Sequence, residues 1–151
     1  MLDYVPAALK RFNHIAPKKP QDQPYPHTKP KYEQKVQYAK DADDSPPLSK
    51  ADKKFVQEVV GVFLYYARAV NLTMLAALGS LVSEQSSPTE NTMKEVLLFL
   101  DYAATHPDAI VTFHASDMIL AVHSDASYLS ESGARSRARG HFSSQTTPPT
   151  R

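Results

Sequence analysis

The chain has 151 residues, a formal net charge of +1 and no cysteine. This length allows one domain with a modest core. The lack of cysteine excludes disulfides, thiolate metal sites and a cysteine nucleophile. No run of about 18 apolar residues occurs, and the N-terminus lacks a basic segment followed by an apolar one. We therefore expect neither a membrane span nor a signal peptide, and a cytoplasmic or nuclear location.

The charges are unevenly distributed along the chain. Residues 1–40 hold 8 Lys and Arg against 3 acidic residues, residues 41–132 hold 5 against 13, and residues 133–151 hold 4 Arg and no acid. Basic ends of this kind permit contact with nucleic acid. They are more often only solvated flanking segments, so charge alone does not decide between the two interpretations.

The first predicted element is a helix within residues 1–14. Val5, Ala8, Leu9 and Phe12 fall on one helical face, and Asp3 can cap the helix. Residues 15–48 follow as a linker, because seven of the 12 prolines lie there and rule out regular structure. We expect this linker to run as an extended strap over a neighbouring surface.

Residues 49–106 are predicted to form three packed helices. The first spans 50–70 after a cap at Ser49, and the second spans 72–85 after a cap at Asn71. The third spans 88–105, with Ser87 as its N-cap and Pro88 as its first helical residue. The inward side chains of the second and third helices are predicted to be Leu72, Leu75, Leu78, Leu81, Val82, Met93, Val96, Leu97, Leu100 and Ala104.

The hydrophobic period then changes from that of a helix to that of a strand, over residues 107–142. The sequence predicts a hairpin of Ile110–His114 with Met118–Ser124, and a third strand that begins near Arg137. Residues 143–151 are polar and are predicted to form a disordered tail. The expected fold is therefore a mostly helical α+β fold that ends in an incomplete sheet.

One carboxylate in this region is a candidate metal ligand. Asp125 follows the apolar run Ile119–Val122, where a buried strand would hold it rigidly, and Mg²⁺ prefers oxygen ligands. Capping of the next turn is the commoner role for such a residue. His123 shares strand parity with Asp125, and His114 would lie on the other predicted strand. A cluster of these three residues would suit a transition metal, but exposed strand histidines are more frequent.

Three arginines follow at a spacing of two residues, at Arg135, Arg137 and Arg139. On a strand they would share one face and could grip a phosphate backbone. Charges that protect an exposed edge strand are an equally good explanation. No glycine-rich phosphate-binding pattern or hydrolase elbow occurs in the chain.

Taken in order, these segments resemble the C-terminal stretch of copia-type retrotransposon polyproteins. His123-Ser124-Asp125-Ala126-Ser127-Tyr128 resembles the Tyr-Ser-Asp-Ala-Asp-Trp segment that opens the ribonuclease H domain of that family. Val59–Arg68 is similar to its Ile-Val-Gly-x-Leu-x-Tyr helix. Further segments resemble the thumb helix, the connection helices and the second ribonuclease H strand, at Asp3–Phe12, Leu72–Gly79, Met93–Tyr102 and Arg135–Phe142.

The resemblance implies the end of a reverse transcriptase that runs into the start of a ribonuclease H. Residues 1–14 would be thumb-like, 49–106 connection-like and 107–142 truncated ribonuclease H-like strands. Asp125 would match the first catalytic carboxylate, with Mg²⁺ as the family's cofactor and an RNA–DNA hybrid as the expected partner. The polymerase aspartates and the remaining nuclease carboxylates are missing from the chain.

We therefore expect a polyprotein fragment without catalytic activity, which binds nucleic acid weakly through its basic segments. In this fragment Asp125 is a vestigial catalytic and Mg²⁺-binding residue, and no cofactor is required. A small helical protein-interaction module is the alternative. A nuclease that borrows the missing carboxylates by oligomerising is a remote third hypothesis.

Overall fold

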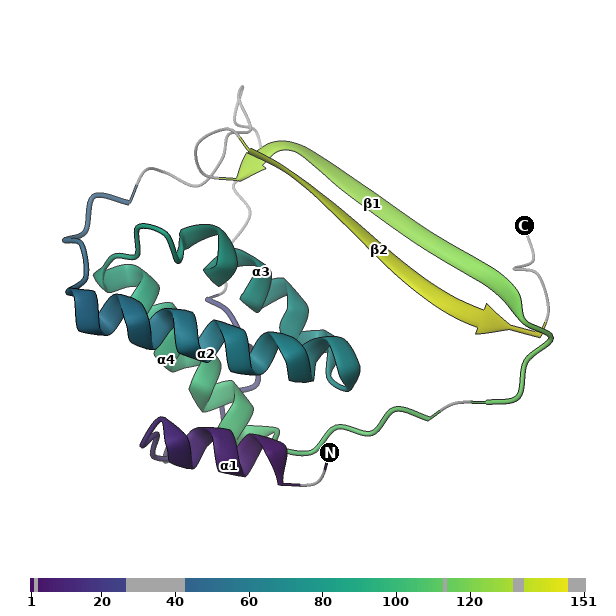
Figure 1. Cartoon of the computed structure of the whole chain (residues 1–151), viewed down its shortest axis with the longest axis horizontal. Coiled ribbons are helices and arrows are strands. Elements are labelled where there is room, and N and C mark those ends of the chain that lie inside the picture. Colours follow the sequence, from purple (N-terminus) through teal and green to yellow (C-terminus); the bar gives the residue numbers. More distant parts are fainter. Residues whose placement is uncertain (2, 27–42, 113, 132–134, 147–151) are drawn as a thin grey trace. The chain divides into compact units, whose positions relative to one another are not determined.

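The computed structural model describes residues 1, 3–26, 43–112, 114–131 and 135–146. The chain divides into two compact units. The helical unit comprises Met1–Lys29 and Asp43–Val111, and the hairpin unit comprises Pro30–Ala42 and Thr112–Arg151. The predicted mostly helical α+β fold is confirmed (Figure 1).

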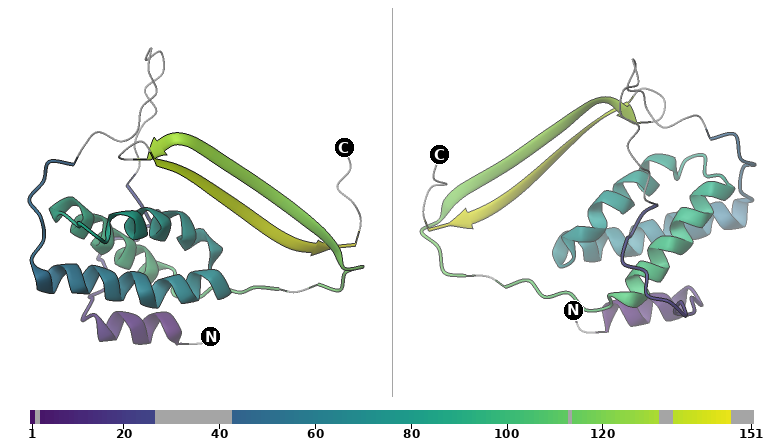
Figure 2. Two further views of the ribbon diagram at one scale, coloured as in Figure 1. Left: turned by 45° about the horizontal axis from the view of Figure 1, so that its top comes forward. Right: turned by 180° about the vertical axis from the view of Figure 1, so that it is seen from behind.

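The helical unit is built from four α-helices and one 3₁₀ turn within the described residues. Helix α2 is the longest, and α3 folds back beside it while α4 crosses the pair (Figures 1 and 2). Helix α1 packs on both α2 and α4, because Phe12 meets Phe55 edge-to-face and α1 also contacts α4. The elements are α1 (Tyr4–Arg11), α2 (Lys50–Ala69), η1 (Leu72–Met74), α3 (Leu75–Glu84) and α4 (Glu90–Thr105).

The core of the helical unit is a single apolar cluster with aromatic rings at its centre. Phe63 of α2 and Phe99 of α4 are both fully buried and meet edge-to-face, with their ring centroids 5.1 Å apart. Tyr4 of α1 stacks on Tyr66 of α2 at 5.3 Å and donates a hydrogen bond to the Val62 carbonyl. The four helices are therefore held by one shared core.

The predicted inward faces are correct in part. Leu78, Leu81, Val96 and Leu100 are buried, as predicted. Leu72, Val82 and Leu97 were wrongly placed inside and are 49%, 36% and 44% exposed. The reason in α4 is that Val96, Phe99, Leu100 and Ala103 already form the buried stripe, and Leu97 lies beside it.

The start of α4 differs from the prediction. Thr89 is the N-cap, not Ser87, and its side chain accepts a hydrogen bond from the Thr92 backbone amide in a capping box. Pro88 is kept out of the helix because its carbonyl accepts a hydrogen bond from Leu48 N at 3.0 Å, and Glu90 N donates to Pro46 O at 3.0 Å. Tertiary pairing of this segment with residues 46–48 therefore moves the helix start by two residues.

Two of the three other predicted caps are correct. Ser49 accepts from the Asp52 amide at the start of α2, and Asn71 accepts from Thr73 N at the start of η1. Asp3 precedes α1 but makes no side-chain capping hydrogen bond, since its backbone is left-handed with φ of 61°. The predicted cap at Asp3 is therefore wrong.

The proline-rich segment contacts α4 at both ends of that helix. At the C-terminal end, Gln21 N donates to Thr105 Oγ1 at 3.0 Å, and Asp22 meets His106 at 3.2 Å. At the N-terminal end, Asn91 Nδ2 donates to Asp43 Oδ1 at 2.9 Å. The described parts of the predicted strap, residues 15–26 and 43–48, therefore lie against the helices as expected, while residues 27–42 lie outside the described part of the chain.

The hairpin unit contains β1 (Ile119–Glu131) antiparallel to β2 (Arg135–Gln145). The predicted pairing of Ile110–His114 with Met118–Ser124 is wrong, because the described residues of 110–114 form no strand and residues 119–131 are one continuous strand. The predicted third strand from Arg137 is instead the second strand of the hairpin. It continues past Phe142 through Gln145, so the first residues of the predicted tail are ordered.

Within the described residues, no helix combines the length and the apolar character needed to cross a membrane.

Candidate nucleic-acid interface on the hairpin

The register of the hairpin decides which candidate residues lie together. His123 is opposite His141, and Asp125 is opposite Arg139. Directly opposed residues project from the same face of an antiparallel pair, and so do residues two apart on one strand. These four residues therefore share one polar face, and all four side chains are exposed.

Asp125 lies within a strand and not at the rim of a sheet. The prediction placed it just past the end of an apolar strand, but β1 continues for six more residues to Glu131. Its direct neighbour across the hairpin is Arg139. Asp125 is thus positioned as the partner of an arginine rather than as a member of a carboxylate cluster.

The described part of the chain contains no complete set of ligands for the predicted metal site. No group of three or more His, Asp or Glu residues is placed there to hold a metal ion. His114 is not on the hairpin, so the cluster of His114, His123 and Asp125 does not form. Two-metal phosphodiester cleavage needs several converging carboxylates, and Asp125 is the only carboxylate among the side chains that the structure describes on this face.

The three predicted nucleic-acid-binding arginines all fall on β2. Arg135, Arg137 and Arg139 occupy alternate positions of the strand, and Ser127 is the register partner of Arg137. The side chains of Arg135 and Arg137 lie outside the described residues, while that of Arg139 is exposed. The prediction that the three arginines occupy alternate positions of one strand is confirmed for the backbone.

The opposite face of the hairpin carries an apolar patch. Val122 pairs with Phe142, and Leu120 lies two residues before Val122 on the same strand. Their side chains are 51%, 67% and 68% exposed respectively. The Phe142 ring lies next to Gly140 on its own strand. A Cβ atom added at Gly140 would be only 3.2 Å from this ring. The hairpin therefore offers solvent two chemically different faces.

His141 was missed as a candidate from the sequence. The sequence does indicate where the hairpin turns, because the polar stretch around Gly133 interrupts the strand pattern. A hairpin centred on this stretch pairs His123 with His141 and Asp125 with Arg139, as observed. The sequence prediction instead placed the turn at Ser116-Asp117, and that choice displaced every partner.

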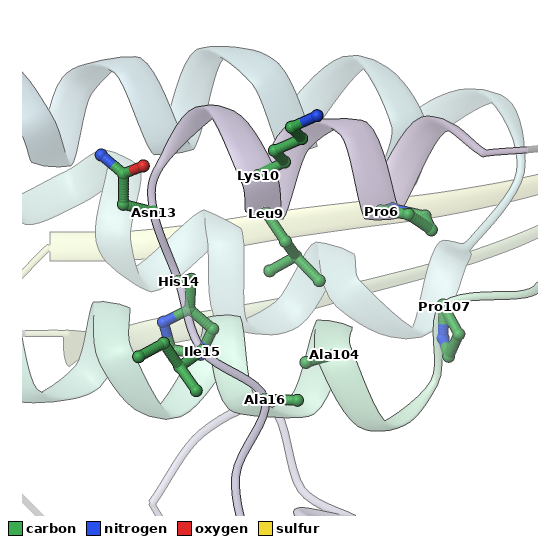
Figure 3. A pocket seen from close by; sticks show the side chains of 9 residues that line it. All are labelled: Pro6, Leu9, Lys10, Asn13, His14, Ile15, Ala16, Ala104 and Pro107. Carbon is green, nitrogen blue, oxygen red and sulfur yellow. The ribbon is translucent and has the colours of Figure 1, made fainter.

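The helical unit has a hollow of about 580 Å³ between α1 and α4 (Figure 3). Leu9 points into it, whereas Lys10 and Asn13 point away from it. His14 at one end is only 11% exposed, and its Nε2 lies 2.8 Å from Asp101 Oδ1. The hollow is thus mainly apolar, and His14 fastens the end of α1 to α4. Its lining consists of Pro6, Leu9, Lys10, Asn13, His14, Ile15, Ala16, Ala104 and Pro107.

In the helical unit, Asp43 and Tyr66 have shifted pKa values. Hydrogen bonds from Thr89, Ser45 and Asn91 hold the pKa of Asp43 well below its usual 3.8. Burial raises the pKa of the Tyr66 hydroxyl, which donates to the Pro107 carbonyl at 3.4 Å. Both groups join loop segments to helices, so these shifts mark structural contacts.

Comparisons with protein-family models, with curated proteins and with solved structures find no match to this chain.

Proposed function

We propose that this chain is a fragment of a copia-type reverse transcriptase–ribonuclease H polyprotein that binds nucleic acid through the polar face of the hairpin and does not cleave it. The observation that carries the proposal is the exposed Arg139 on β2, two residues before His141 and opposite Asp125 of β1 in the register. An exposed arginine on a regular strand presents its guanidinium to phosphate oxygens without disturbing a core.

Three arguments favour nucleic-acid binding over a catalytic role. The first strand of the hairpin, β1, contains the His123–Tyr128 segment of the family resemblance, including Asp125. The described residues place no further carboxylate with Asp125 in a metal-holding group. Phosphate contact requires only exposed cations, whereas hydrolysis requires a preorganised set of ligands.

The sequence preference of such binding is expected to be low. A flat two-stranded face with one described arginine can contact phosphates, which carry no base identity. Affinity should therefore fall steeply with salt and vary little with nucleotide sequence. An RNA–DNA hybrid is the expected duplex because the resembled family acts on it.

The test is a titration of a fluorescent RNA–DNA hybrid with the full chain at several salt concentrations. Arg139→Gln should reduce the slope of log affinity against log salt by about 1 and weaken binding to all sequences alike. Lys54→Gln on α2 is the matched control, because Lys54 is an exposed cation of the helical unit, with its side chain 77% exposed. It should leave binding unchanged.

Two outcomes would contradict the proposal. An equal loss with Lys54→Gln would show that binding reflects charge anywhere on the chain. Mg²⁺-dependent release of RNA fragments, abolished by Asp125→Asn, would show that the fragment is an active nuclease.

A small helical interaction module is the second candidate, and one surface favours it. Tyr65 is 60% exposed on α2, at a shallow hollow of about 410 Å³ that also includes Arg68 and Gly61. Aromatic and arginine side chains are enriched at protein interfaces. If this surface were the functional one, Tyr65→Ser would abolish partner binding and leave nucleic-acid binding intact.

A further inference from the structure

Two histidines face each other directly across the hairpin. His123 on β1 and His141 on β2 are register partners, and both side chains are exposed. Directly opposed residues of an antiparallel pair have Cβ atoms about 4.5–5.5 Å apart and project from the same face. The two histidine side chains therefore project into solvent from adjacent strands on the same face of the hairpin.

This spacing suits a shared metal ion. An imidazole nitrogen coordinates Zn²⁺ at about 2.0–2.1 Å, so two nitrogens on one ion lie roughly 3–4 Å apart. Rings that start at neighbouring Cβ atoms can reach that separation by rotation about their side-chain bonds. Imidazole is a preferred ligand of Zn²⁺, Cu²⁺ and Ni²⁺, whereas Mg²⁺ prefers oxygen.

The charged neighbours on this face are Asp125 and Arg139. They are register partners of each other, two residues away from His123 and His141 respectively. The arginine disfavours a nearby cation and the aspartate favours it, so their effects on the histidine pair oppose each other. The described residues form no metal-holding group of three, so Asp125 is not counted as a ligand.

We propose that His123 and His141 form a binding site for a divalent transition-metal ion, with Zn²⁺ as the representative occupant. The chain supplies two nitrogen ligands, and water occupies the remaining positions. A bound ion joins β1 to β2, so binding free energy becomes stability of the hairpin. A two-stranded hairpin without a covering layer is marginally stable in water, which makes this contribution matter.

The first test is a calorimetric titration of the metal-free full chain with ZnCl₂. One ion should bind per chain, and His123→Asn and His141→Asn should each weaken the affinity more than about tenfold, since even loss of an outer-sphere partner costs 10–100-fold. His114→Asn is the matched control, because His114 is exposed and outside both strands. Asp125→Asn removes only a nearby negative charge and no ligand, so it should weaken the affinity less than either histidine variant.

The second test needs no substitution and follows the histidine ring signals of the wild-type chain by NMR. Zn²⁺ should shift the ring nitrogens of His123 and His141, and slow amide exchange in β1 and β2. Shifts confined to other histidines, or equal Zn²⁺ affinity in the double variant, would overturn the proposal, as would failure of the wild type to bind. These readouts are independent of nucleic-acid binding.

Discussion

The helical unit buries its large apolar side chains, whereas the hairpin leaves its own exposed to solvent. The helical unit encloses Phe63, Phe99 and Leu78 completely, whereas the hairpin leaves Leu120 and Phe142 about two-thirds exposed. Burial of each large apolar side chain stabilises a fold by about 1.5–3 kcal/mol. The helical unit is therefore stabilised by its own buried core, whereas the hairpin exposes its side chains and buries little apolar surface.

The largest expected effect lies in the centre of the helical core. Phe63→Ala removes a fully buried ring that packs edge-to-face on Phe99. The free energy of unfolding should fall by about 3–5 kcal/mol. Urea denaturation followed by far-ultraviolet circular dichroism measures this change. A loss below about 1 kcal/mol would mean that the helices do not share the described core.

A smaller effect should distinguish the observed cap of α4 from the predicted one. Thr89→Ala removes the capping hydrogen bond to the Thr92 amide, which should cost about 1 kcal/mol. Ser87→Ala should cost close to nothing, because Ser87 is exposed and does not cap the helix. The same denaturation experiment compares the two variants. Equal losses would contradict the observed helix start.

This difference shows what the sequence can predict about the helices. The apolar period is local, and it correctly predicted all four α-helices and the caps at Ser49 and Asn71. The start of α4 depends on pairing of Pro88 with Leu48, forty residues away in sequence. No local pattern carries such information, so Ser87-Pro88 was misread as a cap.

The hairpin was harder to predict because strand partners depend on the position of the turn. The sequence identified the alternating arginines, which lie on β2, whereas Asp125 was expected just past a strand and lies within β1. It did not identify the pairing of His123 with His141. A shift of the turn leaves each strand's own alternation unchanged but changes every cross-strand neighbour. Faces were therefore predictable within a strand, and contacts between strands were not.

Acid should weaken the helical unit through Asp43. Hydrogen bonds, first of all from Thr89, lower the pKa of this carboxyl from 3.8. A lowered pKa in the folded state means that the stabilisation is complete above 3.8 and is lost as the pH falls below it. Asp43→Asn should remove part of this acid dependence. Denaturation midpoints of both proteins between about pH 5 and pH 2 measure it, and unchanged acid sensitivity would contradict the assignment.

The smallest expected effect lies on the apolar face of the hairpin. Phe142→Ala deletes a ring that is 67% exposed, so unfolding of the helices should change by no more than about 0.5 kcal/mol. It is the matched counterpart of Phe63→Ala, with the same atoms removed from the other unit. A loss as large as that of Phe63→Ala would show that Phe142 belongs to a core.

Residue-resolved amide hydrogen exchange tests the contrast between the two units most directly. In the free chain, amides of α2 and α4 should exchange slowly, and those of β1 and β2 rapidly. Addition of an RNA–DNA hybrid at low salt should slow exchange in β1 and β2 and leave α2 and α4 unchanged. Protection gained by α2 or α4 instead, or no change in the hairpin, would contradict the hairpin as the nucleic-acid interface.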